Sequence, residues 1–254
     1  MDTVLEIRDL QKRFGGIVVA SNICLELAKG EVVGLIGPNG AGKTSLFNLI
    51  SGFIRQDAGS IILNGRPVER LPMYARARLG LSRTWQNIRL FPSLSVLDNL
   101  VIAPRHYGGE SFLRVAFDRA SIKREHERIT ELAYQQLSKV HLVDAANRLP
   151  TELSYGKQKL VSIARALMND GECLLLDEPI AGVEGAAYEA LRNVIRSEAQ
   201  NGRAICIVEH NITFVRDLCD RALFMFNGQI IESGTIEELT ARKDLTELYF
   251  GSEA

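Results

Sequence analysis

Residues 32–44 read VVGLIGPNGAGKT, and this stretch decides the fold of the 254-residue chain. Its first five residues, 32–36, do not alternate between apolar and polar side chains, which predicts a strand buried on both faces. The next eight match the pattern G-x-x-x-x-G-K-[ST], and a helix-forming run follows at 45–50. A strand, a glycine-rich loop and a helix in this order form a cradle in which backbone N–H groups and the helix N-terminus face phosphate oxygens.

We therefore predict that the chain binds a nucleoside triphosphate. Lys43 would supply a positive charge to the β- and γ-phosphates, and the Thr44 hydroxyl would ligate Mg²⁺. A glycine-rich structural turn is the alternative, but a chance match to the motif in a chain of this length has a probability of about one per cent. The predicted nucleotide-binding residues of this segment are Gly37, Pro38, Asn39, Gly40, Ala41, Gly42, Lys43, Thr44 and Ser45.

Two further apolar runs, 173–176 and 204–208, show the same absence of alternation. Such runs are typical of central strands in a parallel sheet that helices cover on both faces. The first run is followed by Asp177 and Glu178, and the second is followed two residues on by His210. Because ligands of open parallel sheets lie at the carboxyl ends of the strands, we expect these three side chains to converge on the phosphate loop.

The three converging side chains suit the hydrolysis of a bound triphosphate. The Asp177 carboxylate can hold the metal ion through water. Glu178 would lie beside the γ-phosphate, where it can orient or deprotonate an attacking water. His210 can bridge water, Glu178 and the γ-phosphate by hydrogen bonds; taken singly, a strand-end histidine with no chemical role is the alternative.

The remaining patterns predict how the chain is organised around this site. The residue pairs 15–16, 64–65 and 227–228 are Gly-Gly or Asn-Gly, which tolerate positive φ and predict antiparallel hairpins. Residues 116–140 and 160–167 have helical periodicity instead. We predict an α/β fold with a P-loop NTPase core, in which helices cover a mixed, mainly parallel sheet. An antiparallel β subdomain and an inserted α-helical subdomain complete it.

The composition excludes several classes of protein. With 46% hydrophobic and 24% charged residues, the chain has the ordinary balance of a soluble globular protein. The 30 Lys+Arg and 31 Asp+Glu give a net charge of −1, which argues against a protein that mainly coats nucleic acid. No apolar run approaches the ~18–20 residues that cross a bilayer. We expect the four cysteines (Cys24, Cys173, Cys206 and Cys219) to be buried free thiols in a reducing, cytosolic compartment.

Residues 153–158 read LSYGKQ, and this segment resembles the signature sequence L-S-G-G-Q of the ATP-binding cassette (ABC) ATPases. The phosphate loop, Gln86, the signature segment, the Asp177-Glu178 pair and His210 follow one another in the family's order. The resemblance implies one ABC ATPase domain over residues 1–254. Residues 1–86 and 160–254 would form the catalytic core with the antiparallel β subdomain, and 87–159 the helical subdomain.

The resemblance also implies how the site is completed. Two cassettes would dimerise head to tail, with each ATP held between the phosphate loop of one subunit and the signature segment of the other. Phe14 would stack on adenine, with a core position in its hairpin as the alternative. Gln86 would meet Mg²⁺ and act in catalysis with Glu178 and His210, and the metal ligands would be Thr44, Gln86 and Asp177. The signature residues expected at the partner's γ-phosphate are Ser154, Tyr155, Gly156 and Lys157.

The stretch Arg83–Pro92 resembles the surface that receives a membrane subunit. The contact would centre on Trp85–Pro92, with Ile88, Leu90 and Phe91 as its apolar part and local core packing as the alternative. A narrower resemblance rests on residues 82–92, the Tyr155 form of the signature, and residues 209–211, 218–221 and 248–251. These segments resemble the ATPases of importers for branched-chain amino acids and related small polar solutes. This resemblance implies transmembrane permease subunits, a second identical or related ATPase, an indirect solute-binding partner, and a peripheral location on the cytosolic face of the inner membrane.

Two departures from the family pattern bear on hydrolysis. Lys157 replaces the signature glutamine, and Val183-Glu184-Gly185 replaces the usual Leu-Asn/Asp-Pro where the chain crosses to the partner. Two rival functions stay open: a soluble ABC ATPase acting on nucleic acid or ribosomes, and a weakly hydrolysing regulatory cassette. The single phosphate loop and the lack of a basic tract disfavour the first. The presence of Lys43, Asp177, Glu178 and His210 disfavours the second.

Overall fold

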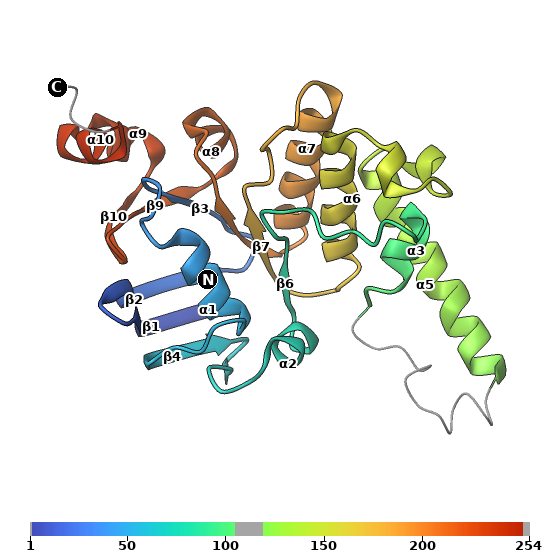
Figure 1. Cartoon of the computed structure of the whole chain (residues 1–254), viewed down its shortest axis with the longest axis horizontal. Coiled ribbons are helices and arrows are strands. Elements are labelled where there is room, and N and C mark those ends of the chain that lie inside the picture. The colour runs from blue at the N-terminus through green and yellow to red at the C-terminus, as the bar shows by residue number, and fades with distance from the viewer. Residues whose placement is uncertain (1, 105–118, 251–254) are drawn as a thin grey trace. The chain divides into compact units, whose positions relative to one another are not determined.

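The computed structural model describes residues 2–104 and 119–250 of the chain (Figure 1). The described residues divide into two compact units. Unit 1 comprises residues 1–83, 171–179 and 195–254, and unit 2 comprises residues 84–170 and 180–194. Helix α7 (Ala186–Gln200) contributes its first part to unit 2 and its last part to unit 1.

Unit 1 contains two β-sheets. The first sheet is wholly antiparallel, with strand order β2-β1-β4-β5. Its strands are β1 (Thr3–Phe14), β2 (Ile17–Ala28), β4 (Ala58–Leu63) and β5 (Arg66–Pro67). The second sheet has the order β10-β9-β3-β8-β7-β6 and is parallel except for the β9–β10 hairpin. Its strands are β3 (Val32–Ile36), β6 (Leu81–Arg83), β7 (Cys173–Asp177), β8 (Ala204–Val208), β9 (Arg221–Phe226) and β10 (Gln229–Gly234).

The sequence patterns account for both sheets. The three apolar runs form β3, β7 and β8, which lie side by side, and every residue in them is buried. The three turn pairs join β1 to β2, β4 to β5 and β9 to β10, each antiparallel as predicted. The expected mixed, mainly parallel sheet and the antiparallel β subdomain are therefore confirmed.

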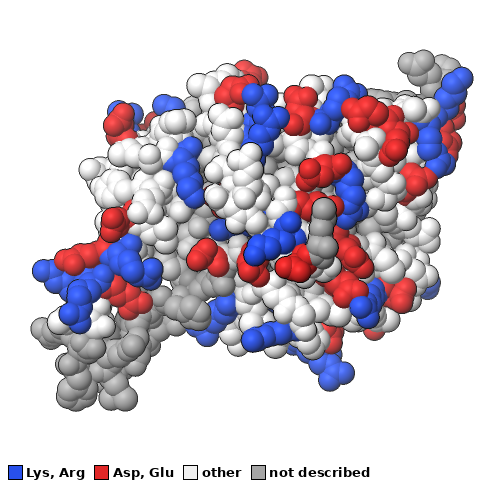
Figure 2. Space-filling model, turned by 180° about the vertical axis from the view of Figure 1, so that it is seen from behind, with Lys and Arg blue, Asp and Glu red and all other residues white. Residues whose placement is uncertain are grey.

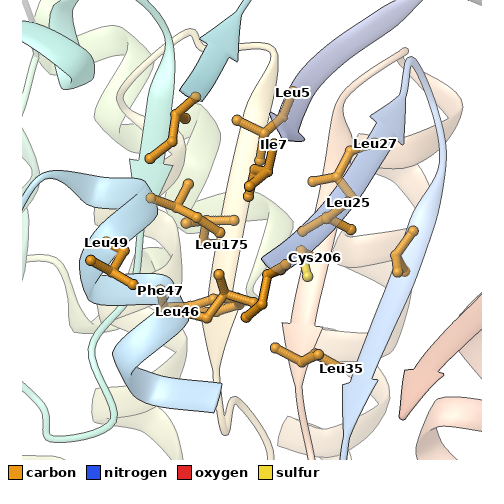
Figure 3. Packing of buried hydrophobic residues seen from close by; sticks show 14 of the residues in the cluster. Leu5, Ile7, Leu25, Leu27, Leu35, Leu46, Phe47, Leu49, Leu175 and Cys206 are labelled. Atoms are coloured by element: carbon orange, nitrogen blue, oxygen red, sulfur yellow. The ribbon is translucent and has the colours of Figure 1, made fainter. Parts of the chain in front are cut away.

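Helix α1 (Lys43–Ser51) packs against both sheets of unit 1. Its buried residues Leu46, Phe47 and Leu49 belong to one apolar cluster with residues of β1, β2, β3, β7 and β8 (Figure 3). At its end, Gly52 adopts the left-handed conformation, and the buried Arg76 donates to the Leu49 and Ile50 carbonyls at 2.8 Å. Burial lowers the pKa of Arg76 to about 10. The helix that follows the phosphate loop is thus fixed at its apolar face and at its C-terminal end.

The other helices of unit 1 are short. They are α2 (Met73–Arg78), α8 (Ile212–Leu218), α9 (Ile236–Ala241) and α10 (Lys243–Phe250). Ile236 and Leu239 of α9 pack with Phe224 of β9 in a second, smaller apolar cluster. The cluster also includes residues of α8, α10 and β3, so it joins the C-terminal helices to the six-stranded sheet.

Unit 2 is helical. It contains α3 (Val96–Val101), α5 (Arg119–Lys139), α6 (Tyr155–Leu167), the first part of α7, and the 3₁₀ turns η2 (Val143–Ala145) and η3 (Pro150–Glu152). The helical periodicity predicted over 116–140 and 160–167 corresponds to α5 and α6; residues 116–118 lie outside the described part of the chain. Ser154 caps α6 by accepting from the Lys157 N–H. The predicted subdomain boundaries stay a prediction.

The expectation that all four cysteines are buried was wrong. Cys173 and Cys206 are buried in central strands, but Cys219 is only partly buried and Cys24 is exposed. The reason lies in β2, where residues alternate between the two faces of an antiparallel sheet and Cys24 is on the outward face. Burial raises the pKa of the Cys206 thiol to about 12, which makes it unreactive.

On the face of the molecule shown in Figure 2, Lys and Arg side chains are interspersed with Asp and Glu side chains. This agrees with the formal net charge of −1. In the part of the chain that the structure describes, no helix has the length and apolarity required to cross a bilayer.

Candidate active site

The phosphate loop lies at the carboxyl end of β3, in unit 1. Residues 37–42 connect the buried strand directly to α1, which starts at Lys43. Two hydrogen bonds fix the loop: the Gly228 N–H donates to the Ala41 carbonyl at 2.9 Å, and the Ala41 N–H donates to the Pro38 carbonyl at 3.2 Å. The loop is therefore held between its own helix and the β9–β10 turn.

The glycines of this loop have different surroundings. A Cβ at Gly37 would lie 2.0 Å from the Met225 carbonyl oxygen, and one at Gly42 would lie 2.6 Å from the Val19 carbonyl oxygen. At Gly40, in contrast, no atom lies within 4 Å of the position of a Cβ. The loop thus packs closely against backbone at Gly37 and Gly42 and faces open space at Gly40, as a ligand cradle requires.

The Lys43 side chain returns over the loop. It is only 6% exposed, and its ammonium group donates to the Gly37 and Pro38 carbonyls at 2.6 and 2.9 Å. Burial holds the pKa of Lys43 below its ordinary value, while the negative charges of Glu178 and Asp177 oppose that shift. Both bonded carbonyls are neutral, so an anion in the loop would favour the charged ammonium further.

The six-stranded sheet brings Asp177 and Glu178 to the level of the phosphate loop. Asp177 is the last residue of β7 and pairs with Val208 of β8, and Val208 also pairs with Leu35 of β3. The three strand ends therefore lie at one edge of the sheet. Glu178 then turns out of the strand with φ +47° while its N–H donates to the Val208 carbonyl at 2.9 Å.

His210 lies next to Glu178. Its Nε2 is 3.2 Å from Glu178 Oε1, and the two side chains are 39% and 21% exposed. The His210 N–H donates to the carboxylate of the buried Glu209 at 3.1 Å. The structure therefore brings Glu178 and His210 within hydrogen-bond distance of each other while leaving both accessible to water and substrate. A solvent-facing pair of this kind can orient a water molecule.

The oxygen groups near the loop fit Mg²⁺. Thr44 is exposed at the start of α1, and Asp177 is buried at the end of the neighbouring strand. Hydroxyl and carboxylate oxygens are hard donors of the kind that Mg²⁺ takes, and it usually keeps several waters and phosphate oxygens as its other ligands. Gln86, the third predicted ligand, belongs to unit 2.

Arg83 is a residue of this site that the sequence patterns did not predict. It ends β6, and its guanidinium donates to Asp177 Oδ2 at 3.1 Å and to Asn48 Oδ1 at 2.8 Å. In the sequence it falls at the start of the stretch Arg83–Pro92 that resembles a docking surface, three residues before Gln86, and no pattern of the phosphate site includes it.

Phe14 is not a core aromatic of its hairpin. It ends β1 beside the Gly15-Gly16 turn, and 47% of it is exposed. The Lys12 ammonium lies 5.1 Å from the centre of its ring, and Lys12 in turn pairs with Asp57 at 2.7 Å. This exposure excludes the core position in the hairpin that was the alternative. An exposed ring held in this way can stack on a planar ligand, so the contact of Phe14 with adenine stays a prediction.

The signature segment lies in unit 2, at the N-terminus of α6. Ser154, Tyr155 and Lys157 are exposed and Gly156 is partly buried, so this end of the 13-residue helix is accessible to a ligand. The Tyr155 ring packs over Gly182: a Cβ at Gly182 would lie 2.8 Å from it. Accessible N–H groups at a helix N-terminus favour an anion.

The segment around Gln86 is held by two basic residues of α6 in the same unit. The buried Lys159 donates to the Gln86 carbonyl at 3.1 Å, and Arg165 donates to the Arg89 carbonyl at 2.6 Å. The Arg89 guanidinium lies 4.1 Å from the centre of the Trp85 ring. The path of residues 86–89 is therefore tied to the helix that carries the signature segment.

The apolar residues of the predicted docking surface differ in exposure. Ile88 and Leu90 are partly buried, whereas 51% of Phe91 is exposed. The Phe91 backbone is fixed by the buried Asn99, which exchanges hydrogen bonds with its N–H and carbonyl at 2.8 and 3.0 Å. A firmly held, exposed phenylalanine fits a contact surface better than local core packing.

Comparison with known proteins decides the family, because the ABC transporter family model matches residues 20–181, more than half of the chain. The chain belongs to the ABC transporter family. It is 34% identical over 250 residues to the high-affinity branched-chain amino acid transport ATP-binding protein LivG of Escherichia coli strain K12, covering 98% of each chain. It is 32% identical over 249 residues to the lipopolysaccharide export system ATP-binding protein LptB of the same strain, again covering 98% of each.

Solved structures agree with this assignment. The ADP conformation of MJ1267, an ATP-binding cassette of an ABC transporter, matches with a TM-score of 0.85 and 32% identity, over 99% of this chain and 100% of that one. The predicted family, the α/β fold with a P-loop NTPase core and the function as an ATP-binding cassette of a transporter are thereby confirmed. The roles of individual residues in this ABC cassette stay predictions.

Proposed function

We propose that this ABC cassette hydrolyses Mg²⁺-bound ATP and thereby energises a membrane importer for branched-chain amino acids or similar small polar solutes. One observation carries the catalytic part of the proposal. The Glu178–His210 pair lies at the same sheet edge as the end of β3, from which the phosphate loop and Lys43 follow. A nucleotide-binding module without hydrolysis would not need a water-orienting pair there.

The residues of unit 1 have different roles in hydrolysis. The loop amides and Lys43 bind the phosphates, and Thr44 and Asp177 would hold Mg²⁺, which neutralises charge that develops on the phosphate oxygens. Glu178 orients a water molecule and accepts its proton as the water oxygen bonds to the γ-phosphorus. The bond from that phosphorus to the β–γ bridging oxygen breaks, giving ADP and phosphate. His210 keeps the Glu178 carboxylate oriented and can donate to the γ-phosphate.

The second half of the site would come from another cassette. Ser154, Tyr155, Gly156 and Lys157 are accessible at the N-terminus of α6, where N–H groups and the Lys157 charge suit the γ-phosphate held by a partner subunit. We assign Gln86 to the metal and the attacking water, and Phe14 to adenine. ATP binding would close a head-to-tail dimer of identical or related cassettes, and hydrolysis would reopen it.

The transport partners are permease subunits. The segment Trp85–Pro92, with the exposed Phe91, would receive them, and a solute-binding protein would act on the outer side of the membrane. The proposed location of the cassette is therefore the cytoplasm, at the cytosolic face of the inner membrane. The amino-acid solute rests on the similarity to LivG, and the similarity to LptB makes lipopolysaccharide export the specific rival.

Two measurements test the proposal. Purified chain should hydrolyse ATP with Mg²⁺, and Glu178→Gln should abolish that activity while binding ATP. The assembled complex in proteoliposomes should then take up leucine when ATP is supplied on the cassette side. ATP hydrolysis that nucleic acid stimulates and permease subunits do not would refute the transport assignment. If hydrolysis is coupled to the release of lipopolysaccharide and not to leucine uptake, the assignment of a branched-chain amino acid as the solute is refuted.

A further inference from the structure

Arg83 connects the phosphate-loop helix to the metal-binding strand inside unit 1. Its side chain is 5% exposed, and that of Asp177 is 1% exposed. One end of the guanidinium, Nη1, donates to Asn48 Oδ1 at 2.8 Å and to Ser51 Oγ at 3.0 Å. The other, Nη2, donates to Asp177 Oδ2 at 3.1 Å. A single side chain therefore bonds two residues of α1 and the last residue of β7.

The shape of the group makes this connection rigid. Guanidinium is planar and presents its donors in a fixed fork, so two donors that are each engaged determine its orientation. Its face also lies 5.7 Å from the centre of the Phe47 ring on α1. Because α1 starts at Lys43, the position of the Asp177 carboxylate is tied to the helix that carries Lys43 and Thr44.

We propose that Arg83 is a positioning residue that holds the Asp177 carboxylate in the orientation needed for Mg²⁺. This inference rests on the proposed function, since it assumes that Asp177 serves the metal of a bound nucleotide. With Oδ2 bonded to Arg83, rotation of the carboxylate is restrained before any metal arrives. Groups that orient metal ligands in this way typically contribute 10- to 100-fold to metal affinity.

A purely structural role predicts different behaviour. Exchanging a buried ion pair for other side chains changes stability throughout a domain, whereas a positioning role changes one equilibrium in particular. The matched control is Arg203, which pairs with Glu198 at 3.2 Å with 11% and 5% exposure. Arg203 precedes β8, at the opposite end of that strand from the site. Arg203→Gln therefore removes a comparable buried guanidinium from the same unit.

The test separates nucleotide binding from metal binding in the full-length chain. The affinity for ATP is measured calorimetrically in EDTA and then across a Mg²⁺ titration, for the wild type, Arg83→Gln, Arg83→Lys and Arg203→Gln. We expect Arg83→Gln to bind ATP in EDTA within about twofold of the wild type and to need roughly 10- to 100-fold more Mg²⁺ for half-saturation. Arg83→Lys keeps the charge without the fork and should show a smaller shift; Arg203→Gln should show none.

Three results would overturn the inference. The first is an unchanged Mg²⁺ requirement in Arg83→Gln, or in Arg83→Lys if the glutamine variant does not fold. The second is a loss of ATP affinity in EDTA as large as the loss in Mg²⁺. The third is an equal shift in Arg203→Gln. Failure of the proposed function gives a different result, because the wild type itself would then show no Mg²⁺-dependent gain in ATP affinity. The inference about Arg83 would be refuted in that case as well.

Discussion

Gly37→Ala tests whether the phosphate loop depends on close packing against β9. A Cβ at Gly37 would lie 2.0 Å from the Met225 carbonyl oxygen and 3.0 Å from the carbonyl carbon. Both are backbone atoms of a neighbouring strand, so no side chain can rotate to make room. Ordinary contact starts at 3.4 Å, so the loop or the strand would have to move by 1.4 Å.

Two terms add in this variant. Gly37 has φ +148°, a region that is costly for residues with a Cβ, by about 1–3 kcal/mol. Overpacking adds about 1–3 kcal/mol where the neighbours are well packed. The free energy of unfolding should therefore fall by about 2–6 kcal/mol, a large share of the ~5–15 kcal/mol that is typical of native proteins.

Gly40→Ala is the matched control, because it lies in the same loop at φ +81° with no atom within 4 Å of the new Cβ. It should lose only the backbone term of about 1–2 kcal/mol. Urea denaturation followed by circular dichroism gives both free energies of unfolding. If the two variants agree within about 0.5 kcal/mol, the clash with Met225 contributes nothing and the reasoning is refuted.

Three further predictions concern catalysis and pH. Glu178→Gln should lower kcat by about 10²–10⁴-fold with little change in ATP affinity; a steady-state rate near that of the wild type would contradict the assigned base. Lys157→Gln should alter turnover more than nucleotide affinity, and an unchanged rate with weaker ATP binding would count against it. Hydrogen bonds from Lys12 and Arg13 hold the pKa of Asp57 below its usual range, so that carboxylate stabilises the fold above about pH 3.9. Asp57→Asn should lower the urea midpoint at pH 7, and the difference should vanish as the pH falls through the folded-state pKa; a constant difference down to pH 3 would show that charge is not the cause.

The parts of the fold that could be predicted from the sequence are those set by local pattern. Residues 32–36 lack alternation because both faces of β3 are covered, and that is visible in the sequence alone. The Asn227-Gly228 turn is equally local, since it requires positive φ at both residues and shows it. The convergence of Asp177 and His210 followed from a general property of parallel sheets and needed no knowledge of the family.

The parts that could not be predicted depend on contacts between distant segments. Arg83 meets Asp177, 94 residues away in sequence, and no spacing rule connects them. Lys159 is similar: a lysine on a helix usually faces solvent, but this one is buried against the Gln86 carbonyl, 73 residues away. Cys24 was misjudged because an apolar neighbourhood in sequence does not say which face of an antiparallel strand a residue occupies.

The stacking of Arg89 on Trp85 has a practical consequence. Trp85 is the single tryptophan of the chain, and it directly precedes Gln86. Indole emission responds to a cation placed over the ring, so any rearrangement that separates the 4.1 Å pair changes the spectrum. The natural protein thus carries its own optical reporter beside Gln86, and stopped-flow mixing with nucleotide can follow any rearrangement of that segment without an added dye.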